Sequence, residues 1–343
     1  MENGRIWISE LAARDKWLSL RKEEIIWPEL PIVDPHHHLW KRQNNSYQMT
    51  ELISDICSGH NVKKTVYVEC GAFYRDSGPN YLRSLGEVEY VQSIINTQED
   101  DDVAGSRRFC ISGIVSKIDL RLPNLNAIVR EHVAKSGGNL KGVRHSAAFA
   151  KDSCPYSIPG HGPSGLYLDA NYQSGARKLG ELNLALDCWH YFSQSAEFIK
   201  FLNEVPNTKI VLNHLGMPVG IGSSRYKGRL FEDWKLVIEK ISRFSNVFVK
   251  LGGVAMVDMG WGFHNRAEPI GSEEYAELIK PLMIHAIDTF GPDRCMFESN
   301  FPVDRVSLGY NVLWNAFKII CSDLEESAIT TLFSGTAKSV YQL

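Results

Sequence analysis

Residues 31–40 read PIVDPHHHLW, and this stretch decides the fold that we predict. An apolar run, typical of a β-strand, ends in three consecutive histidines. Side chains of a strand alternate between its two faces, so His36 and His38 point to one side and His37 points to the other. Two imidazoles on one face can hold one metal ion. A lone histidine would more simply be a satisfied polar group, so the prediction depends on this spacing.

Similar apolar runs recur along the whole chain, and helical patterns with apolar residues three and four positions apart lie between them. The runs are almost continuously apolar, as expected for strands that are covered on both faces. They read LPIVDPHHHL, VKKTVYVEC, RFCISGIVSKID, LKGVRHSA, LALDCWHYF, TKIVLNHLG, NVFVKLGGVA and RCMFESNFP. Eight alternating strands and helices predict an α/β fold, namely a (β/α)8 TIM barrel, with a doubly wound open sheet as the alternative.

The composition is that of one large globular domain. The 343 residues are 22% charged and 44% apolar, with a net charge of −3. An α/β barrel commonly needs about 250 residues, so one domain can account for most of this length. We predict the barrel over residues 29–343 and a short N-terminal helical extension over residues 1–28, from the pattern ISELAARDKWLSL. The extension is expected to cap the bottom of the barrel or to contact a partner.

Several classes of partner are not expected. No cluster of Lys and Arg supplies the positive surface that nucleic acids need. No window reaches about 18 consecutive apolar residues, and the first residues lack the apolar core of a signal peptide, so we predict a cytoplasmic protein without membrane spans. The seven cysteines are scattered without a CxxC pair and are expected to be reduced. A small-molecule anionic substrate remains as the partner, and a homo-oligomer stays open.

Polar side chains stand at the ends of six of these apolar strands. They are His36, His38, Glu69, Arg144, His145, His190, His214, Glu298 and Asn300. Burying so many ionisable groups without partners would cost roughly several kcal/mol each. Because the C-terminal ends of barrel strands meet at one mouth, we predict a functional site there.

The residue types indicate the chemistry of this site. Imidazole and carboxylate suit zinc or another divalent metal, which lowers the pKa of a bound water toward about 7 and makes hydrolysis the expected reaction. The guanidinium of Arg144 favours an anionic substrate. Two long connections, residues 149–169 and 256–271, follow strands and either line the pocket or form flexible surface loops. In the second, Trp261 and His264 are candidate substrate contacts.

The strings VDPHHHLW, GVRH, LNHLGMP and CMFESNFPVD, in that order, resemble the amidohydrolase-related family of TIM-barrel metal-dependent hydrolases over residues 30–343. The most similar branch contains sugar-acid lactonases and a lactonase of a pyrone dicarboxylate, and a sister branch holds non-oxidative decarboxylases. The resemblance implies metal ligands at His36, His38 and His214, with Arg144 binding the substrate carboxylate. His190 lies on the strand that often carries a further ligand, and His145 and His190 are assigned to substrate binding.

The chain departs from the family at the end of the eighth strand. The family usually has SDWP, whose aspartate binds metal and takes the proton from water, whereas this chain has SNFP. An amide cannot accept that proton, so Asn300 is not a base. Glu298 is the first candidate replacement, unless it only pairs with a buried lysine such as Lys250. Glu69 and Asp304 are rival bases.

Three functions follow from these observations. The first is a hydrolase that opens a lactone of a small carboxylated or oxygen-rich substrate, with zinc as the expected metal, although a metal-free mechanism stays open. The second is a non-oxidative decarboxylase, in which a metal and Arg144 bind a carboxylate and no hydrolytic base is needed. The third is a catalytically silent binder of small molecules.

Overall fold

A computed structural model describes residues 11–42, 45–103, 110–150, 156–157, 160–223 and 228–343. In this described part, eight parallel strands form one sheet in chain order. They are β1 (Pro31–His37), β4 (Asn61–Val68), β5 (Cys110–Ser116), β6 (Leu140–Arg144), β7 (Ala185–Cys188), β8 (Ile210–Leu212), β9 (Val247–Leu251) and β10 (Cys295–Phe297). The two edges meet where His37 bridges to Phe301, since the His38 amide donates to the Phe301 carbonyl at 2.7 Å. The predicted (β/α)8 barrel is confirmed.

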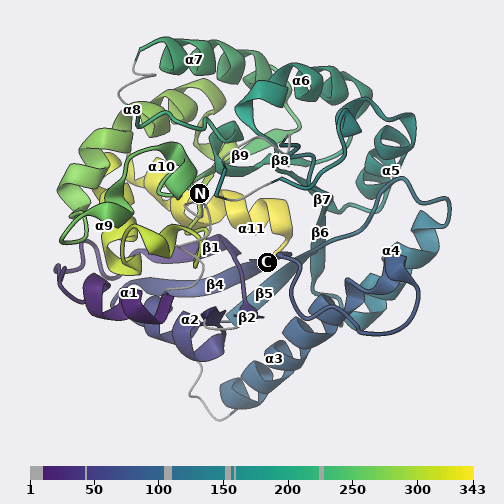
Figure 1. Cartoon of the computed structure of the whole chain (residues 1–343), viewed down its shortest axis with the longest axis horizontal. Coiled ribbons are helices and arrows are strands. Elements are labelled where there is room, and N and C mark those ends of the chain that lie inside the picture. The colour runs from purple at the N-terminus through teal and green to yellow at the C-terminus, as the bar shows by residue number, and fades with distance from the viewer. Residues whose placement is uncertain (1–10, 43–44, 104–109, 151–155, 158–159, 224–227) are drawn as a thin grey trace, which may run out of the picture.

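Helices form the outer ring of the barrel in Figure 1. They are α2 (Met49–Ile56), α3 (Leu85–Val103), α4 (Leu125–Lys135), α5 (Ala170–Glu181), α6 (Ser195–Glu204), α7 (Arg229–Ser242), α8 (Ser272–Phe290), α9 (Tyr310–Ile320) and α10 (Glu326–Thr330). A hairpin of β2 (Trp40–Arg42) and β3 (Asn45–Tyr47) follows β1, and short helical turns η5 (Asn213–Gly216) and η9 (Asp304–Val306) follow β8 and β10. Across the described ranges, we find no helix with the length and apolar character that crossing a bilayer requires.

Two apolar layers hold the barrel together. The larger lies between the strands and the helices, and the smaller fills the barrel interior. The inner layer takes one or two side chains from each of six strands together with three residues of α11 (Thr336–Tyr341): Val33, Val66, Val68, Val115, Ala185, Val211, Met296, Ala337, Val340 and Tyr341. This last helix lies near the middle of the ring in Figure 1 and contacts β1, β10 and the turn that precedes β10. It therefore closes the N-terminal end of the barrel.

The described part of the N-terminal segment does not cap the bottom of the barrel, and its contact with a partner stays a prediction. Helix α1 (Leu11–Leu18) contacts the loop that follows β9, where Arg14 donates to the His264 carbonyl at 2.9 Å and Trp17 donates to the Arg266 carbonyl at 3.0 Å. That loop leaves the C-terminal mouth. The described chain then runs along α8 and α9, where Lys318 Nζ donates to the Ile26 carbonyl at 2.7 Å. Residues 1–10 of the predicted extension lie outside the described residues.

We expect Tyr341→Phe to destabilise the barrel because Tyr341 Oη donates to Asp187 Oδ1 at 2.7 Å inside it. Loss of one hydrogen bond to a charged group should lower the free energy of unfolding by about 1.5–3 kcal/mol, measured by urea denaturation. Tyr47→Phe is the matched control, since Tyr47 Oη donates to Asp55 Oδ2 at 2.8 Å outside the barrel interior, where partial exposure should reduce the loss. Unchanged stability of Tyr341→Phe would show that the helix packs without this bond.

Candidate active site

An irregularity in β1 brings its histidines into the barrel. Val33 belongs to the inner apolar layer, and Asp34 faces outward, accepting a hydrogen bond from Tyr310 of α9 at 3.1 Å. Strict alternation would then turn His36 outward, but the pairing of β1 with β4 shifts register between Asp34 and His37. The shift places His36 and His38 inside, while His37 Nε2 lies 3.0 Å from Thr65 Oγ1.

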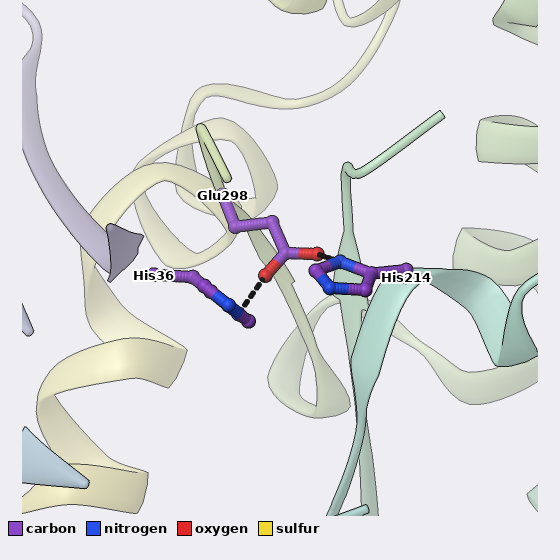
Figure 2. Close-up of side chains that lie close together, drawn as sticks. All are labelled: His36, His214 and Glu298. Atoms are coloured by element: carbon purple, nitrogen blue, oxygen red, sulfur yellow. Dashed lines mark hydrogen bonds and ion pairs between the residues drawn. The ribbon is translucent and has the colours of Figure 1, made fainter. Parts of the chain in front are cut away.

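One carboxylate joins two of the inward histidines. Glu298 Oε1 lies 2.6 Å from His214 Nδ1, and Glu298 Oε2 lies 2.7 Å from His36 Nδ1. Figure 2 shows the carboxylate between the two rings, one oxygen turned toward each. His36 Nε2 in turn lies 3.2 Å from His38 Nε2. All four side chains are buried, so this polar cluster must satisfy itself or bind an ion.

Two glycines after β9 make room for this arrangement. A Cβ on Gly252 would lie 2.4 Å from Glu298 Cγ, and a Cβ on Gly253 would lie 2.2 Å from His214 Nδ1. His214 itself adopts a left-handed backbone, with φ of 54°, in the turn after β8. Larger residues at either glycine would displace the groups that form the cluster.

The ring hydrogens follow from the acceptors. A carbonyl only accepts, so His38 Nδ1, which lies 2.7 Å from the Val68 carbonyl, must carry a hydrogen, and its Nε2 is a bare lone pair. If His36 carries its hydrogen on Nδ1, toward Glu298, the Nε2 lone pairs of His36 and His38 face each other. If it carries the hydrogen on Nε2, the Nδ1 lone pair faces a Glu298 oxygen at 2.7 Å. The first tautomer leaves two facing lone pairs that a cation could bind, whereas in the second the Nδ1 lone pair also faces Lys250 Nζ at 3.2 Å.

This geometry fits a divalent metal. Two imidazole nitrogens on a tetrahedral zinc, each at about 2.0–2.1 Å, lie roughly 3.3 Å apart, close to the 3.2 Å between His36 Nε2 and His38 Nε2. Metal-binding histidines usually donate their other ring N–H to a carboxylate or a backbone carbonyl, as the Nδ1 atoms of His36 and His38 can here. The donor atoms of His36, His214 and Glu298 also lie within 4.8 Å of one another.

Burial keeps the imidazoles neutral. It lowers the pKa of His36 well below the ordinary value, and Lys250 and neighbouring groups lower it further. Burial and then Arg144 likewise lower the pKa of His38. Neutral imidazole is the form that binds metals.

Arg144 and Glu69 form an ion pair beside the histidines. Arg144 Nε donates to Glu69 Oε1 at 2.7 Å, and its NH2 donates to the Glu69 carbonyl. The third nitrogen, NH1, lies 3.5 Å from both His36 Nε2 and Asn213 Oδ1. Sequence reasoning assigned the planar edge of Arg144 to a substrate carboxylate, whereas Glu69 occupies one such edge here.

A second ion pair lies next to the histidines, and sequence reasoning did not anticipate it. Lys250 Nζ donates to Asp187 Oδ2 at 2.7 Å and lies 3.2 Å from His36 Nδ1. Asn213 Nδ2 also donates to Asp187, at 2.9 Å. Lys250 therefore pairs with Asp187. The alternative in which Lys250 pairs with Glu298 is wrong.

Two predicted substrate contacts face away from this cluster. His190 lies among aromatic rings outside the strands, with Nδ1 3.0 Å from Tyr167 Oη, and burial lowers its pKa to about 3. His145 Nδ1 accepts from the Leu120 amide at 3.3 Å, and burial lowers its pKa to about 4. The structure does not bring either ring to the cluster, because the neighbours that do face it, Asp187 and Arg144, take the inward positions of those strands.

The loop after β9 holds Trp261 and His264 through contacts with its own residues and with helix α1. Trp261 Nε1 donates to the Val254 carbonyl at 2.9 Å, and its ring stacks on Phe263. His264 is held by its backbone carbonyl, which accepts from Arg14. Trp261 thus packs within the loop and His264 contacts α1, and the role of both residues toward a substrate stays a prediction.

The end of the eighth strand is tied into the loop that follows it. Asn300, with φ of 54°, donates through Nδ2 to Asp304 Oδ1 at 2.9 Å. Asp304 Oδ2 accepts from the Ala255 amide at 3.1 Å, and burial raises the Asp304 pKa to about 8. Asn300 and Asp304 therefore bond each other, with less than 2% of either residue exposed.

Comparisons with known proteins place the chain in a family. A family model described as amidohydrolase matches residues 33–343. The chain is similar to an uncharacterized protein, y4mH, of Sinorhizobium fredii, with 28% identity over 92% of this chain and 99% of that protein. It is also similar to the L-fucono-1,5-lactonase of Burkholderia multivorans, with 23% identity over 91% of this chain and 96% of the lactonase.

Solved structures share the fold. An amidohydrolase of Burkholderia multivorans with bound zinc has a TM-score of 0.67 and 20% identity, covering 91% of this chain and 99% of that one. A candidate 2-pyrone-4,6-dicarboxylic acid hydrolase of Pseudomonas putida has a TM-score of 0.60 and 15% identity, covering 91% and 98%. The 5-carboxyvanillate decarboxylase of Sphingomonas paucimobilis has a TM-score of 0.52 and 12% identity, covering 92% and 99%.

We expect alanine substitutions of the three consecutive histidines to have different effects on zinc binding and on stability. His36→Ala and His38→Ala should lose zinc binding, measured by calorimetry, because their Nε2 atoms face each other at the mouth. His37→Ala should retain zinc binding but lower the free energy of unfolding by roughly 2–4 kcal/mol, because it leaves a cavity and an unpaired Thr65. Equal loss of zinc binding in all three folded variants would contradict this assignment.

We expect His190→Phe to weaken the acid sensitivity of the fold. The folded pKa of about 3 lies below the roughly 6.5 of an unfolded chain, so the unfolded state binds more protons between these values and stability falls as the pH drops through that window. Between pH 7.5 and pH 5, urea denaturation should show about 2 kcal/mol less loss for the variant than for the wild type. The same loss in both proteins would contradict a buried neutral His190.

Proposed function

Because the chain belongs to the amidohydrolase family, we propose that it is a hydrolase that opens a lactone or comparable ring ester of a small, oxygen-rich or carboxylated substrate. The observation that carries the proposal is the buried histidine cluster at the barrel mouth, whose facing ring nitrogens lie 3.2 Å apart beside an arginine. The L-fucono-1,5-lactonase among its relatives supports a sugar-acid lactone as the first substrate class to test.

We assign a divalent metal to His36, His38 and His214, with zinc as the first candidate because a structural relative binds it. Such an ion would polarise the ester carbonyl and make a water more acidic. Glu298 then has an orienting role, because its oxygens lie 2.7 Å from His36 Nδ1 and 2.6 Å from His214 Nδ1, and hydrogens on these two Nδ1 atoms would leave both Nε2 lone pairs for the metal. It is held too tightly between these rings to act as the base.

Glu69 is the carboxylate that we assign to take the proton of the attacking water. Its side chain is 9% exposed at the mouth, whereas Glu298 and Asp304 are fully buried. Arg144 holds Glu69 at both its side chain and its carbonyl, which fixes the carboxylate in place. The NH1 atom of Arg144, turned toward His36, remains to attract an oxygen of the substrate. Glu69 would thereby take the role of the family's aspartate, whose position in the sequence is occupied by Asn300 in this chain.

A non-oxidative decarboxylase is the second candidate. The observation that favours it is the end of β10, where Asn300 bonds Asp304 and so presents no carboxylate as the usual hydrolytic base. The decarboxylase among the structural neighbours shares only the fold. In this case Arg144 would bind the substrate carboxylate, and the product would be carbon dioxide instead of a new acid.

Two product assays on one substrate panel separate these candidates. We expect acid release from sugar-acid lactones, followed by a pH indicator, and no carbon dioxide from carboxylated aromatic acids. Glu69→Gln should lower kcat at least about 10²-fold in a protein that still folds, as expected for loss of a general base, with a lower melting temperature because Arg144 loses its counter-charge. Glu89→Gln is the matched control, since Glu89 also pairs with an arginine, Arg75, at 2.9 Å but on α3.

Other outcomes reassign the chemistry. Full activity of Glu69→Gln would contradict its role as base. Carbon dioxide release without acid release would favour the decarboxylase, and saturable binding with neither product would favour a silent binder.

A further inference from the structure

Lys250 is a buried cation that the proposed reaction does not use. It lies on β9 with none of its surface exposed, and its Nζ is 3.2 Å from His36 Nδ1. Its position is fixed, because Nζ also bonds Asp187 at 2.7 Å and lies 5.2 Å from the centre of the Tyr341 ring. The amino group of Lys250, paired with a carboxylate, therefore stands directly beside a candidate metal ligand.

Asp187 holds this lysine through a network from four elements. Its Oδ2 accepts from Lys250 of β9 and from Asn213 of η5, and its Oδ1 accepts from Tyr341 of α11. The carboxylate itself lies on β7 and is fully buried. With so many donors, Asp187 can neither leave Lys250 nor move toward the histidines, so the ion pair is a fixed part of the barrel interior.

Lys250 and a divalent ion oppose each other at His36 for two reasons. Like charges repel strongly in a buried site, where the effective dielectric constant is well below that of water. In addition, Lys250 can donate to His36 Nδ1 only when that nitrogen carries no hydrogen, which puts the ring hydrogen on Nε2. A metal at Nε2 requires the hydrogen on Nδ1, so its binding breaks the contact with Lys250.

We infer that Lys250, neutralised and positioned by Asp187, sets the affinity of the histidine cluster for a divalent cation. The ammonium weakens binding, and the carboxylate behind it restores part of the affinity. The inference rests on the metal site of the proposed function but not on the reaction, so it is tested without turnover.

The test is calorimetric titration of Zn²⁺ into metal-free, full-length protein. Lys250→Met should bind zinc at least about tenfold more tightly than the wild type, because a repelling unit charge is gone. Asp187→Asn should bind zinc at least about tenfold more weakly, because the lysine loses its counter-charge. The double variant should lie between the two single variants. Damage to the fold would weaken binding in both single variants, so opposite signs identify an electrostatic effect.

Lys318→Met is the matched control. Lys318 of α9 is also a buried lysine beside a histidine, with Nζ 2.9 Å from His60 Nδ1, but it donates to the Ile26 and Trp27 carbonyls of the N-terminal segment and not to the inner carboxylate. This variant should lose stability in thermal melts without a change in zinc affinity. If Asp187→Asn fails to fold, Lys250→Met against Lys318→Met still decides the sign.

Unchanged or weaker zinc binding by folded Lys250→Met overturns the inference. Zinc binding by Lys250→Met but not by the wild type supports it, and in that case the metal assignment of the proposed function fails while acid release still tests hydrolysis. A third outcome is that the wild type releases acid but Lys250→Met binds zinc no more tightly. This result would support the hydrolase function and reject the role of Lys250.

Discussion

The shared carboxylate of Glu298 is the interaction on which the site depends. It draws together one imidazole from the first strand and another from the turn after β8, each at hydrogen-bonding distance. Three local features of the backbone serve this meeting: the register shift in β1, the left-handed turn at His214 and the two glycines after β9. A carboxylate buried without these partners would cost several kcal/mol, roughly the range for an unpaired buried charge, so the cluster also constrains the fold.

The sequence predicted the barrel and the strands that carry the site, because apolar runs ending in polar residues leave a clear pattern. Its errors came from side-chain direction. On the fifth strand the conspicuous residue was His190, yet alternation around the inward Asp187 turns His190 outward. On the fourth strand the same reasoning separates Arg144, which faces the cluster, from His145, which faces Tyr172. Alternation along the fifth strand places Asp187 and His190 on opposite faces, so the sequence could have shown that only one of them reaches the site.

Other parts of the site had no local pattern in the sequence. Tyr341 meets Asp187 across 154 residues of chain, and nothing in the last helix distinguishes a tyrosine that enters a barrel from one that packs against its wall. The N-terminal helix is a similar case. Its residues predicted a helix, but its contacts with the loop after β9 include hydrogen bonds from Arg14 and Trp17 to backbone carbonyls. Backbone acceptors are present in every loop, so such contacts cannot be located from residue types.

The closure of the barrel between its first and last strands has a consequence for folding. Ser299 bonds the His36 carbonyl across 263 residues, and Lys250 meets His36 across 214. Contacts at such separations form late, since the entropy of closing a long loop must be overcome first. A partly folded chain would therefore hold its ionisable groups in water, without their mutual partners, until the eighth strand docks. Pairing of the last strand with the first strand both closes the sheet and assembles the site. A barrel in which these two strands are not yet paired would therefore lack the organised histidine cluster that binds a metal ion.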